Sequence, residues 1–231
     1  MSISLRQNIF FIAAFALIGI VVMQVPFTRL AGSRVSFTLS DFFAPIATGF
    51  IGTVPGIAAV LLMQIGNFFL HGAEVVDAGT IIRFFPMLAA AYYFGRKDKL
   101  SLILPIIAIA AFIAHPIGRT VWYFAFYWLI PVAAWFFRDR FLLARALGAT
   151  FSAHAVGGAL WIWTFNLPAA VWIGLIPVVA VERFLFAGGI AATYIVAVNV
   201  LHFLQKRHII PLPFTLNTKY LLNISRVRVS S

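Results

Sequence analysis

Four titratable side chains lie close together in a chain that otherwise carries few charges. They are His71, Glu74, Asp77 and Arg83. The three-residue spacing of His71 and Glu74 would place both on one face of a helix, where they could bind a metal ion. Gly72 and Gly79 favour a loop instead. The segment therefore favours a polar or ion-paired substrate site over a metal site.

A second set of candidate residues combines a cation with aromatic rings. Trp122 and Tyr123 follow Arg119 by about one helical turn, and His115 precedes Arg119 by another. Apolar walls with a few convergent polar groups are typical of a small-molecule pocket. An aromatic belt at a membrane interface explains most of the aromatic residues and is the favoured interpretation, and the pocket is the alternative for Trp122 and Tyr123.

His154 stands apart from these sets because it falls near the middle of a long apolar run. Its neighbours Ser152, Gly157 and Gly158 are small, which permits close packing of helices. A hydrogen bond across a helix interface is therefore the favoured role for His154. Ligand binding or proton transfer is the alternative.

The composition places these residues in a membrane protein. Hydrophobic residues make up 63% of the 231 and charged residues only 10%, whereas soluble domains have about 45–50% and about 25%. The formal net charge of +11 comes from Lys and Arg in short connections between apolar runs, which is a topological signal and does not indicate nucleic-acid binding. The chain has no cysteine, which excludes disulfides and thiolate metal sites.

The apolar runs predict an all-α fold, a polytopic transmembrane bundle of about 6–8 helices. This transmembrane helical domain covers residues 1–205, and a basic cytoplasmic tail covers residues 206–231. The expected helices cover residues 8–26, 41–53, 55–70, 80–95, 100–114, 118–137, 141–165 and 181–205. Pro168, Gly174 and Pro177 interrupt the remaining apolar run, so residues 167–181 are expected to form a re-entrant or interfacial segment.

The charged connections predict that both termini are cytoplasmic in a multi-pass cell-membrane protein. With that orientation 12 of the 17 Lys and Arg residues lie inside. Residues 41–70 must then enter the membrane and return on the same side. A helix of 13 residues (41–53) reaches only about 20 Å across a hydrocarbon core of about 30 Å. We therefore expect a short helical hairpin at 41–70 that turns near residues 53–56.

The remaining polar residues fall at the outer ends of the helices in this topology. They are Asp41, Asn67, His71, Glu74, Asp77, Arg83, His115, Arg119, Asn166, Glu182 and Arg183. Ionisable residues at membrane depth usually face a cavity or a partner, although charges at the headgroups often only anchor a helix. Asp41 is expected to cap the second helix. Glu182 is interpreted as a helix N-terminal carboxylate and Arg183 as a snorkelling side chain.

Three features of the first 95 residues lead to a resemblance. The first helix contains the small residues Ala13, Ala14 and Ala16, residues 37–45 read Phe-Thr-Leu-Ser-Asp-Phe-Phe-Ala-Pro, and residues 52–56 join two short helices. This pattern resembles the substrate-binding S components of energy-coupling-factor vitamin transporters. The resemblance implies capture of a vitamin or precursor at the outer face and a transmembrane coupling protein with ATPase subunits as partner.

The expected function is binding and uptake of a small organic solute from the outer face, without catalysis and without a cofactor. Metabolite-binding candidates are Asn67, His71, Glu74, Asp77, Arg83, His115, Arg119, Trp122, Tyr123 and His154. The chain has no Gly-x-x-x-x-Gly-Lys, Gly-x-Ser-x-Gly or His-Glu-x-x-His motif. The alternatives are a membrane sensor or scaffold domain, or an intramembrane enzyme that uses the outer His/Glu/Asp cluster.

Overall fold

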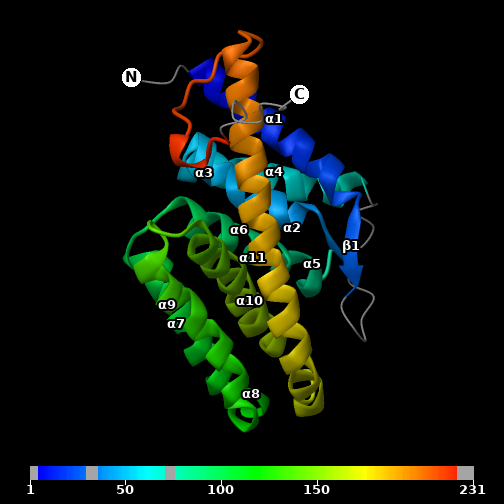
Figure 1. Cartoon of the computed structure of the whole chain (residues 1–231). Coiled ribbons are helices and arrows are strands. Elements are labelled where there is room, and N and C mark those ends of the chain that lie inside the picture. Colours follow the sequence, from blue (N-terminus) through cyan, green and yellow to red (C-terminus); the bar gives the residue numbers. More distant parts are fainter. Residues whose placement is uncertain (1–4, 30–35, 71–75, 223–231) are drawn as a thin grey trace, which may run out of the picture.

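The computed structural model describes residues 5–29, 36–70 and 76–222. These residues are almost entirely helical, which confirms the all-α class (Figure 1). The helices are α1 (Leu5–Met23), α2 (Ser40–Phe43), α3 (Ala47–Ile51), α4 (Thr53–Leu70), α5 (Ala78–Ile82), α6 (Phe84–Gly95), α7 (Lys99–Ala114), α8 (Pro116–Thr120), α9 (Ile130–Phe137), α10 (Leu142–Phe165) and α11 (Ala169–Lys206). Short 3-10 helices are η1 (Ala44–Ile46), η2 (Trp122–Leu129) and η3 (Thr218–Tyr220). The strands β1 (Pro26–Arg29) and β2 (Ser36–Thr38) form a small antiparallel hairpin.

The helical hairpin expected at residues 41–70 is built from α2, η1 and α3 on one side and α4 on the other. The chain reverses at Gly52, whose φ of 91° is in the left-handed region that favours glycine. The two arms then approach closely, because a Cβ atom on Gly56 would lie 2.6 Å from the Thr48 backbone. The turn therefore lies one residue before the predicted residues 53–56, which begin α4.

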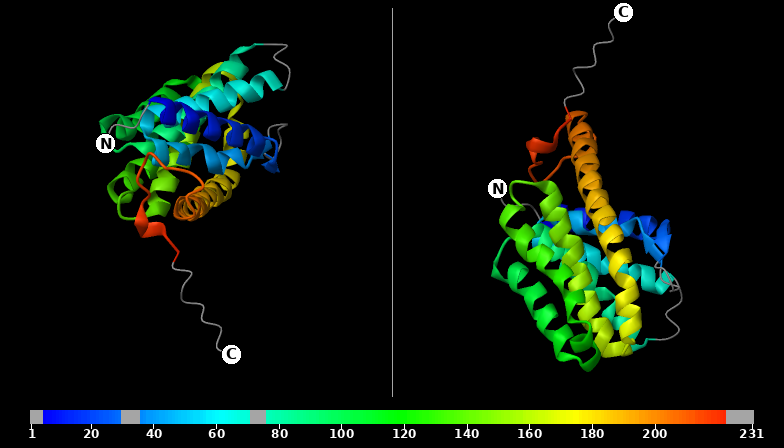
Figure 2. Two further views of the ribbon diagram at one scale, coloured as in Figure 1. Left: turned by 90° about the horizontal axis from the view of Figure 1, so that it is seen from above. Right: turned by 60° about the horizontal axis from the view of Figure 1, so that its bottom comes forward.

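Helix α10 lies at the centre of the molecule and packs against α6, α7, α9 and α11. Two glycines allow this close approach. A Cβ atom at Gly148 would lie 2.0 Å from the Tyr93 ring, and one at Gly158 would lie 2.5 Å from Trp128. In Figure 2, α7, α9, α10 and α11 run alongside one another, whereas α1 and α4 lie across them.

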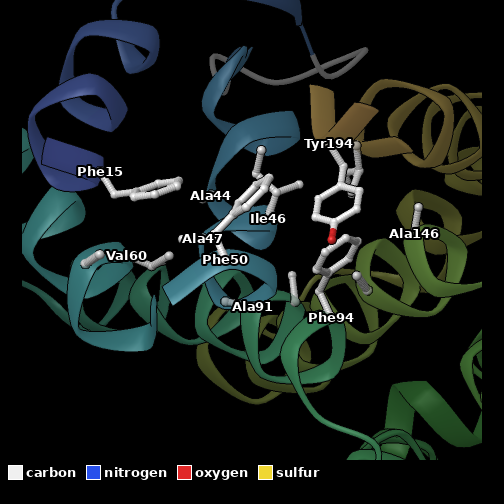
Figure 3. Packing of buried hydrophobic residues seen from close by; sticks show 14 of the residues in the cluster. Phe15, Ala44, Ile46, Ala47, Phe50, Val60, Ala91, Phe94, Ala146 and Tyr194 are labelled. Atoms are coloured by element: carbon white, nitrogen blue, oxygen red, sulfur yellow. The ribbon is translucent and has the colours of Figure 1, made fainter. Parts of the chain in front are cut away.

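Two aromatic-rich clusters form the core. In the first cluster, Tyr194 of α11 lies against Phe94 of α6 and Phe50 of α3, with ring centroids 5.4 and 4.9 Å apart (Figure 3). The second cluster surrounds Phe112 of α7, which contacts Trp128 and Trp172 with centroids 5.0 and 4.9 Å apart. The clusters thus join α11 to the bundle at two levels along its length.

Helix α11 contradicts the prediction of a re-entrant segment at residues 167–181. It is one continuous helix of 38 residues, about 57 Å long at 1.5 Å per residue. Pro177 removes one backbone hydrogen bond, but the helix is held on both sides of it because Trp172 and Val179 are buried in the second core cluster. Tertiary packing therefore overrides the helix-breaking signal.

Two helices are long and apolar enough to cross a membrane, among the residues described. These are Thr53–Leu70 and Ala169–Lys206. Shorter apolar helices cover Asn8–Met23, Lys99–Ala114 and Trp122–Phe137. Among the described residues, the helices that are long and apolar enough for a membrane span are therefore fewer than the six to eight spans expected.

The basic connections after α6 and α9 lie together at one end of the bundle. Arg138 donates hydrogen bonds to the carbonyl oxygens of Arg96 and Phe94, at 2.6 and 3.1 Å. Lys97 pairs with Asp139 at 2.7 Å. These cations neutralise the partial negative charge at the carboxyl end of α6.

The segment that follows α11 folds back towards this end. The Asn199 side chain donates to the carbonyl oxygen of Tyr220 at 2.9 Å and accepts from the Leu222 amide at 2.8 Å. Lys219 Nζ donates to the carbonyl oxygen of Arg140 at 2.8 Å. The part of the predicted tail that is described, up to Leu222, is thus tied to the helical domain.

Candidate functional site

The cluster expected between His71 and Arg83 is only partly visible, since His71 and Glu74 lie outside the described residues. Asp77 caps α5, where its Oδ1 accepts hydrogen bonds from the Thr80 amide at 2.7 Å and from the Thr80 hydroxyl at 2.8 Å. These two bonds, with a smaller effect from the Arg83 charge, lower the pKa of Asp77. The Arg83 side chain is exposed. Asp77 therefore has a local structural role.

The second candidate set surrounds the short helix α8. His115 is buried and caps α8, because its Nδ1 accepts from the Ile117 amide at 3.3 Å. Its ring packs edge-on against Trp163, with centroids 4.9 Å apart. Arg119, Trp122 and Tyr123 are exposed on the outside of the molecule. Their outward position agrees with the interpretation of the aromatic residues as an interfacial belt.

These two sets lie near the same end of α10 without forming one cluster in the part of the chain described. Gly79 of the first set packs against Phe165 of α10, and His115 packs against Trp163. Asn67 lies elsewhere, at the end of α4, where its Oδ1 accepts from Gln24 Nε2 at 3.0 Å. The predicted binding residues that the structure describes therefore lie at separate positions and do not form one site.

His154 forms the cross-interface hydrogen bond that its small neighbours favoured. Trp128 Nε1 donates to His154 Nδ1 at 2.9 Å, which joins η2 to α10. An indole can only donate, so Nδ1 must be unprotonated and a neutral ring carries its proton on Nε2. The rings of Phe124 and Phe151 also pack against His154.

A charged cluster lies between α2 and α11 and is the strongest candidate site among the described residues, with two of its three side chains buried and the third, Asp41, half-buried. It consists of Asp41, Glu182 and Arg183, called here the α2–α11 charge cluster. The charges of both acids act on the Arg183 guanidinium. Buried charges are costly unless they are paired or bind a ligand, so this cluster requires an explanation.

Arg183 is held by contacts with α10 and with its own helix. Only 8% of it is exposed, and its Nη1 donates to Thr150 Oγ1 of α10 at 3.4 Å. Its Cζ lies 4.8 Å from the centroid of the Phe186 ring, one turn further along α11. The ring of Phe186 in turn contacts Phe42 of α2 edge-on, with centroids 5.4 Å apart.

The hydrogen-bonding capacity of Glu182 is not fully used. Only 8% of it is exposed, and its Oε2 has no hydrogen-bond partner among the described residues. A carboxylate oxygen buried without a partner is rare in proteins and marks a position where another group can bind. No group of three or more His, Asp or Glu side chains that could hold a metal ion occurs in the described part of the chain.

Asp41 reaches the cluster because α2 packs tightly on α11. Its Oδ2 accepts from the Thr38 amide at 2.9 Å. Thr38 precedes the helix, so Asp41 fastens the end of β2 and does not cap α2 as expected. The close approach depends on Gly189, where a Cβ atom would lie 2.6 Å from the Phe42 ring.

The interpretations of Glu182 and Arg183 were also wrong. Glu182 lies 13 residues after Ala169, the first residue of α11, so the helix N-terminus is too distant to stabilise its charge. Arg183 does not snorkel to a surface, since it is buried against Thr150. The sequence signal for this cluster is a pair of oppositely charged residues inside an apolar run. The predicted break near Pro177 placed this pair at a helix end and not inside a helix.

Comparison with family models, with curated proteins and with solved structures finds no match. The site is therefore interpreted from its own geometry.

Proposed function

We propose that this chain is an integral membrane protein that binds a small organic solute from the outer face and takes it up, without catalysis of its own. The observation that carries the proposal is the α2–α11 charge cluster. It places a buried carboxylate oxygen that has no hydrogen-bond partner in the described part of the chain among helices whose outer surfaces are apolar. Ionisable residues at such positions commonly mark the path of a substrate.

The outward surface of the helices supports a location in the membrane. On α7, the side chains of Leu100, Ile103 and Ile107 are about half exposed, and on α11 Val181 and Phe184 are more than half exposed. Apolar faces of this extent are unfavourable in water but suit a lipid environment. Together with the two long apolar helices, they favour a protein that crosses the bilayer several times.

The distribution of charge supports an orientation with both termini in the cytoplasm. The basic connections around Arg96 and Arg138 lie at one end of the bundle, and Lys219 reaches the same end. Positive charge is enriched in cytoplasmic connections. The first residue of α11, Ala169, then lies outside, and Glu182 is about 20 Å from it along the helix axis.

The nature of the solute and of the partner follows from the resemblance to the S components of energy-coupling-factor transporters. A vitamin or a precursor of one would bind, and a transmembrane coupling protein with ATPase subunits would supply the energy.

Asp77 and Asp41, two acids that the structure describes, have different roles in this proposal. Asp77 caps a helix, whereas Asp41 contributes to the site.

Capture of small molecules by the purified protein tests the proposal. The chain is placed in lipid nanodiscs, incubated with a bacterial metabolite extract and washed, and bound compounds are identified by mass spectrometry. We expect at least one compound to be enriched and to bind saturably. Asp41→Asn, which keeps an oxygen for the Thr38 amide, is expected to weaken binding at least tenfold.

Asp139→Asn is the matched control, because it removes the same charge from an exposed acid that pairs with Lys97. It is expected to bind like the wild type. Enrichment of no compound, or equal losses in Asp41→Asn and Asp139→Asn, would count against the proposal.

A further inference from the structure

We infer that the solute of the α2–α11 charge cluster is a small organic cation. The inference rests on the proposed function, because it specifies the chemical class of ligand at the same site. It is carried by the juxtaposition of two carboxylates and one guanidinium beside aromatic rings of α2 and α11. One oxygen of Glu182 has no hydrogen-bond partner within the described ranges.

The charges of the cluster do not balance. Asp41 and Glu182 together carry two negative charges when ionised, and Arg183 carries one positive charge. His154, on which the charge of Arg183 also acts, adds no charge. Its Nδ1 accepts a hydrogen bond from Trp128, and a protonated ring would lose that bond and face the guanidinium. With both acids ionised, one negative charge remains for a ligand to neutralise.

The Glu182 carboxylate offers the point of attachment. Its Oε2 is buried without a hydrogen-bond partner among the described residues. Phe186 lies one turn from Glu182 and therefore on the same side of α11 as Glu182. The ring of Phe42 packs on the ring of Phe186. The Phe186 ring already packs against the Arg183 guanidinium, so the charge of the Glu182 carboxylate is what attracts an organic cation, and the aromatic rings form its apolar surroundings.

Other ligand classes fit less well. Ca²⁺ takes about six to eight oxygen ligands and Mg²⁺ about six, whereas the cluster has two carboxylates, and no group of three metal-ligating acids or histidines occurs among the residues described. An anion would have to bind Arg183, whose Nη1 already donates to Thr150 and whose charge faces two carboxylates. A positively charged solute meets neither difficulty.

Three probes that share one ring and differ in charge test the inference. They are 1-methylnicotinamide, which is a cation, nicotinamide, which is neutral, and nicotinate, which is an anion. Dissociation constants for the wild type in nanodiscs are measured by calorimetry. We expect the cation to bind at least tenfold more tightly than the neutral probe, and the anion not to bind. In Glu182→Gln the cation and the neutral probe should differ less than threefold, whereas Asp139→Asn should keep the tenfold preference.

The dissociation constants of the three probes for the wild type show which ligand charge is preferred, even if Glu182→Gln does not fold. Equal affinities, or tighter binding of the neutral or anionic probe, would overturn the inference. If none of the three probes binds, the charge of the solute captured from the metabolite extract tests the inference. A cation supports the inference, and a neutral or anionic solute overturns it while the proposed function stands. Capture of nothing at all overturns the proposed function instead.

Discussion

Most polar side chains near the helix ends stabilise local structure. Asp77 and His115 each accept a backbone hydrogen bond at the start of a short helix. Asp98 does the same for α7, since its Oδ1 accepts from the Ser101 amide at 2.9 Å, and Ser101 Oγ accepts from the Asp98 amide at 3.2 Å. These residues contrast with the α2–α11 charge cluster, where Glu182 and Arg183 are buried.

Asp98 gives a prediction about pH. Burial raises the pKa of Asp98, but hydrogen bonds from the Tyr92 hydroxyl and the Ser101 amide, with the charge of Arg96, lower it more, and the net pKa is below 3.8. The stabilisation is therefore complete above about pH 3.8 and is lost as the pH falls through the lower value of the folded state. Replacing this cap in Asp98→Ala should cost about 1 kcal/mol at neutral pH.

Thermal unfolding in detergent between pH 3 and pH 7 measures this difference. The gap in Tm between wild type and Asp98→Ala should close at the acid end. Asp98→Asn serves as the control, because an amide caps a helix without titrating and its contribution should not depend on pH. A gap that stays constant down to the lowest pH would contradict the role assigned to the Asp98 carboxylate.

The sequence predicted which residue types were unusual but not how deeply each would lie. Glu182 and Arg183 were recognised as exceptions in an apolar run, yet they were assigned to a helix end. Their burial depends on Thr150 and Phe42, which come from distant parts of the chain. Hydrophobic periodicity does not contain such contacts, so the α2–α11 charge cluster could not be assembled from the sequence.

Among the elements, the helices with uninterrupted apolar runs were predicted well and α11 was not. The residues of α4, α6, α7 and α10 agree with the expected ranges to within a few positions. The failure at Pro177 arose because proline and glycine act locally, whereas Trp172 and Val179 hold α11 from outside through the second core cluster. The sequence signal was real, but packing outweighed it.

Replacement of Pro177 tests the continuity of α11. Pro177→Ala restores the amide that can donate to the carbonyl oxygen of Ile173, so it should leave the helical circular dichroism signal unchanged and keep or raise Tm. Pro116→Ala is the control, because Pro116 is the first residue of α8, where proline costs nothing. A clear gain of helical signal in Pro177→Ala, absent from Pro116→Ala, would indicate that the wild-type chain does break at Pro177.

At the scale of the whole molecule, the proposed orientation predicts which connections are accessible from outside. The chain has no cysteine, so single cysteines can be introduced without further changes. Thr120→Cys in α8 and Lys97→Cys after α6 are both exposed and lie at opposite ends of α7. A membrane-impermeant maleimide should label Thr120→Cys in intact cells and Lys97→Cys only after permeabilisation.

Labelling of Lys97→Cys in intact cells, with protection of Thr120→Cys, would reverse the orientation and place the basic end outside. Labelling of both would show that α7 does not cross the membrane. Either result would remove the argument that Glu182 is reached from the end of α11 at Ala169.

The central claim is that the solute binds at the α2–α11 charge cluster. Hydrogen–deuterium exchange of the protein in nanodiscs, with and without the captured solute, tests it most directly because it requires no substitution. We predict slower exchange at Thr38 to Phe43 and around Glu182, with no change at residues 115–123. Protection confined to residues 115–123, with none at Asp41 or Glu182, would place the site at α8 and contradict the claim.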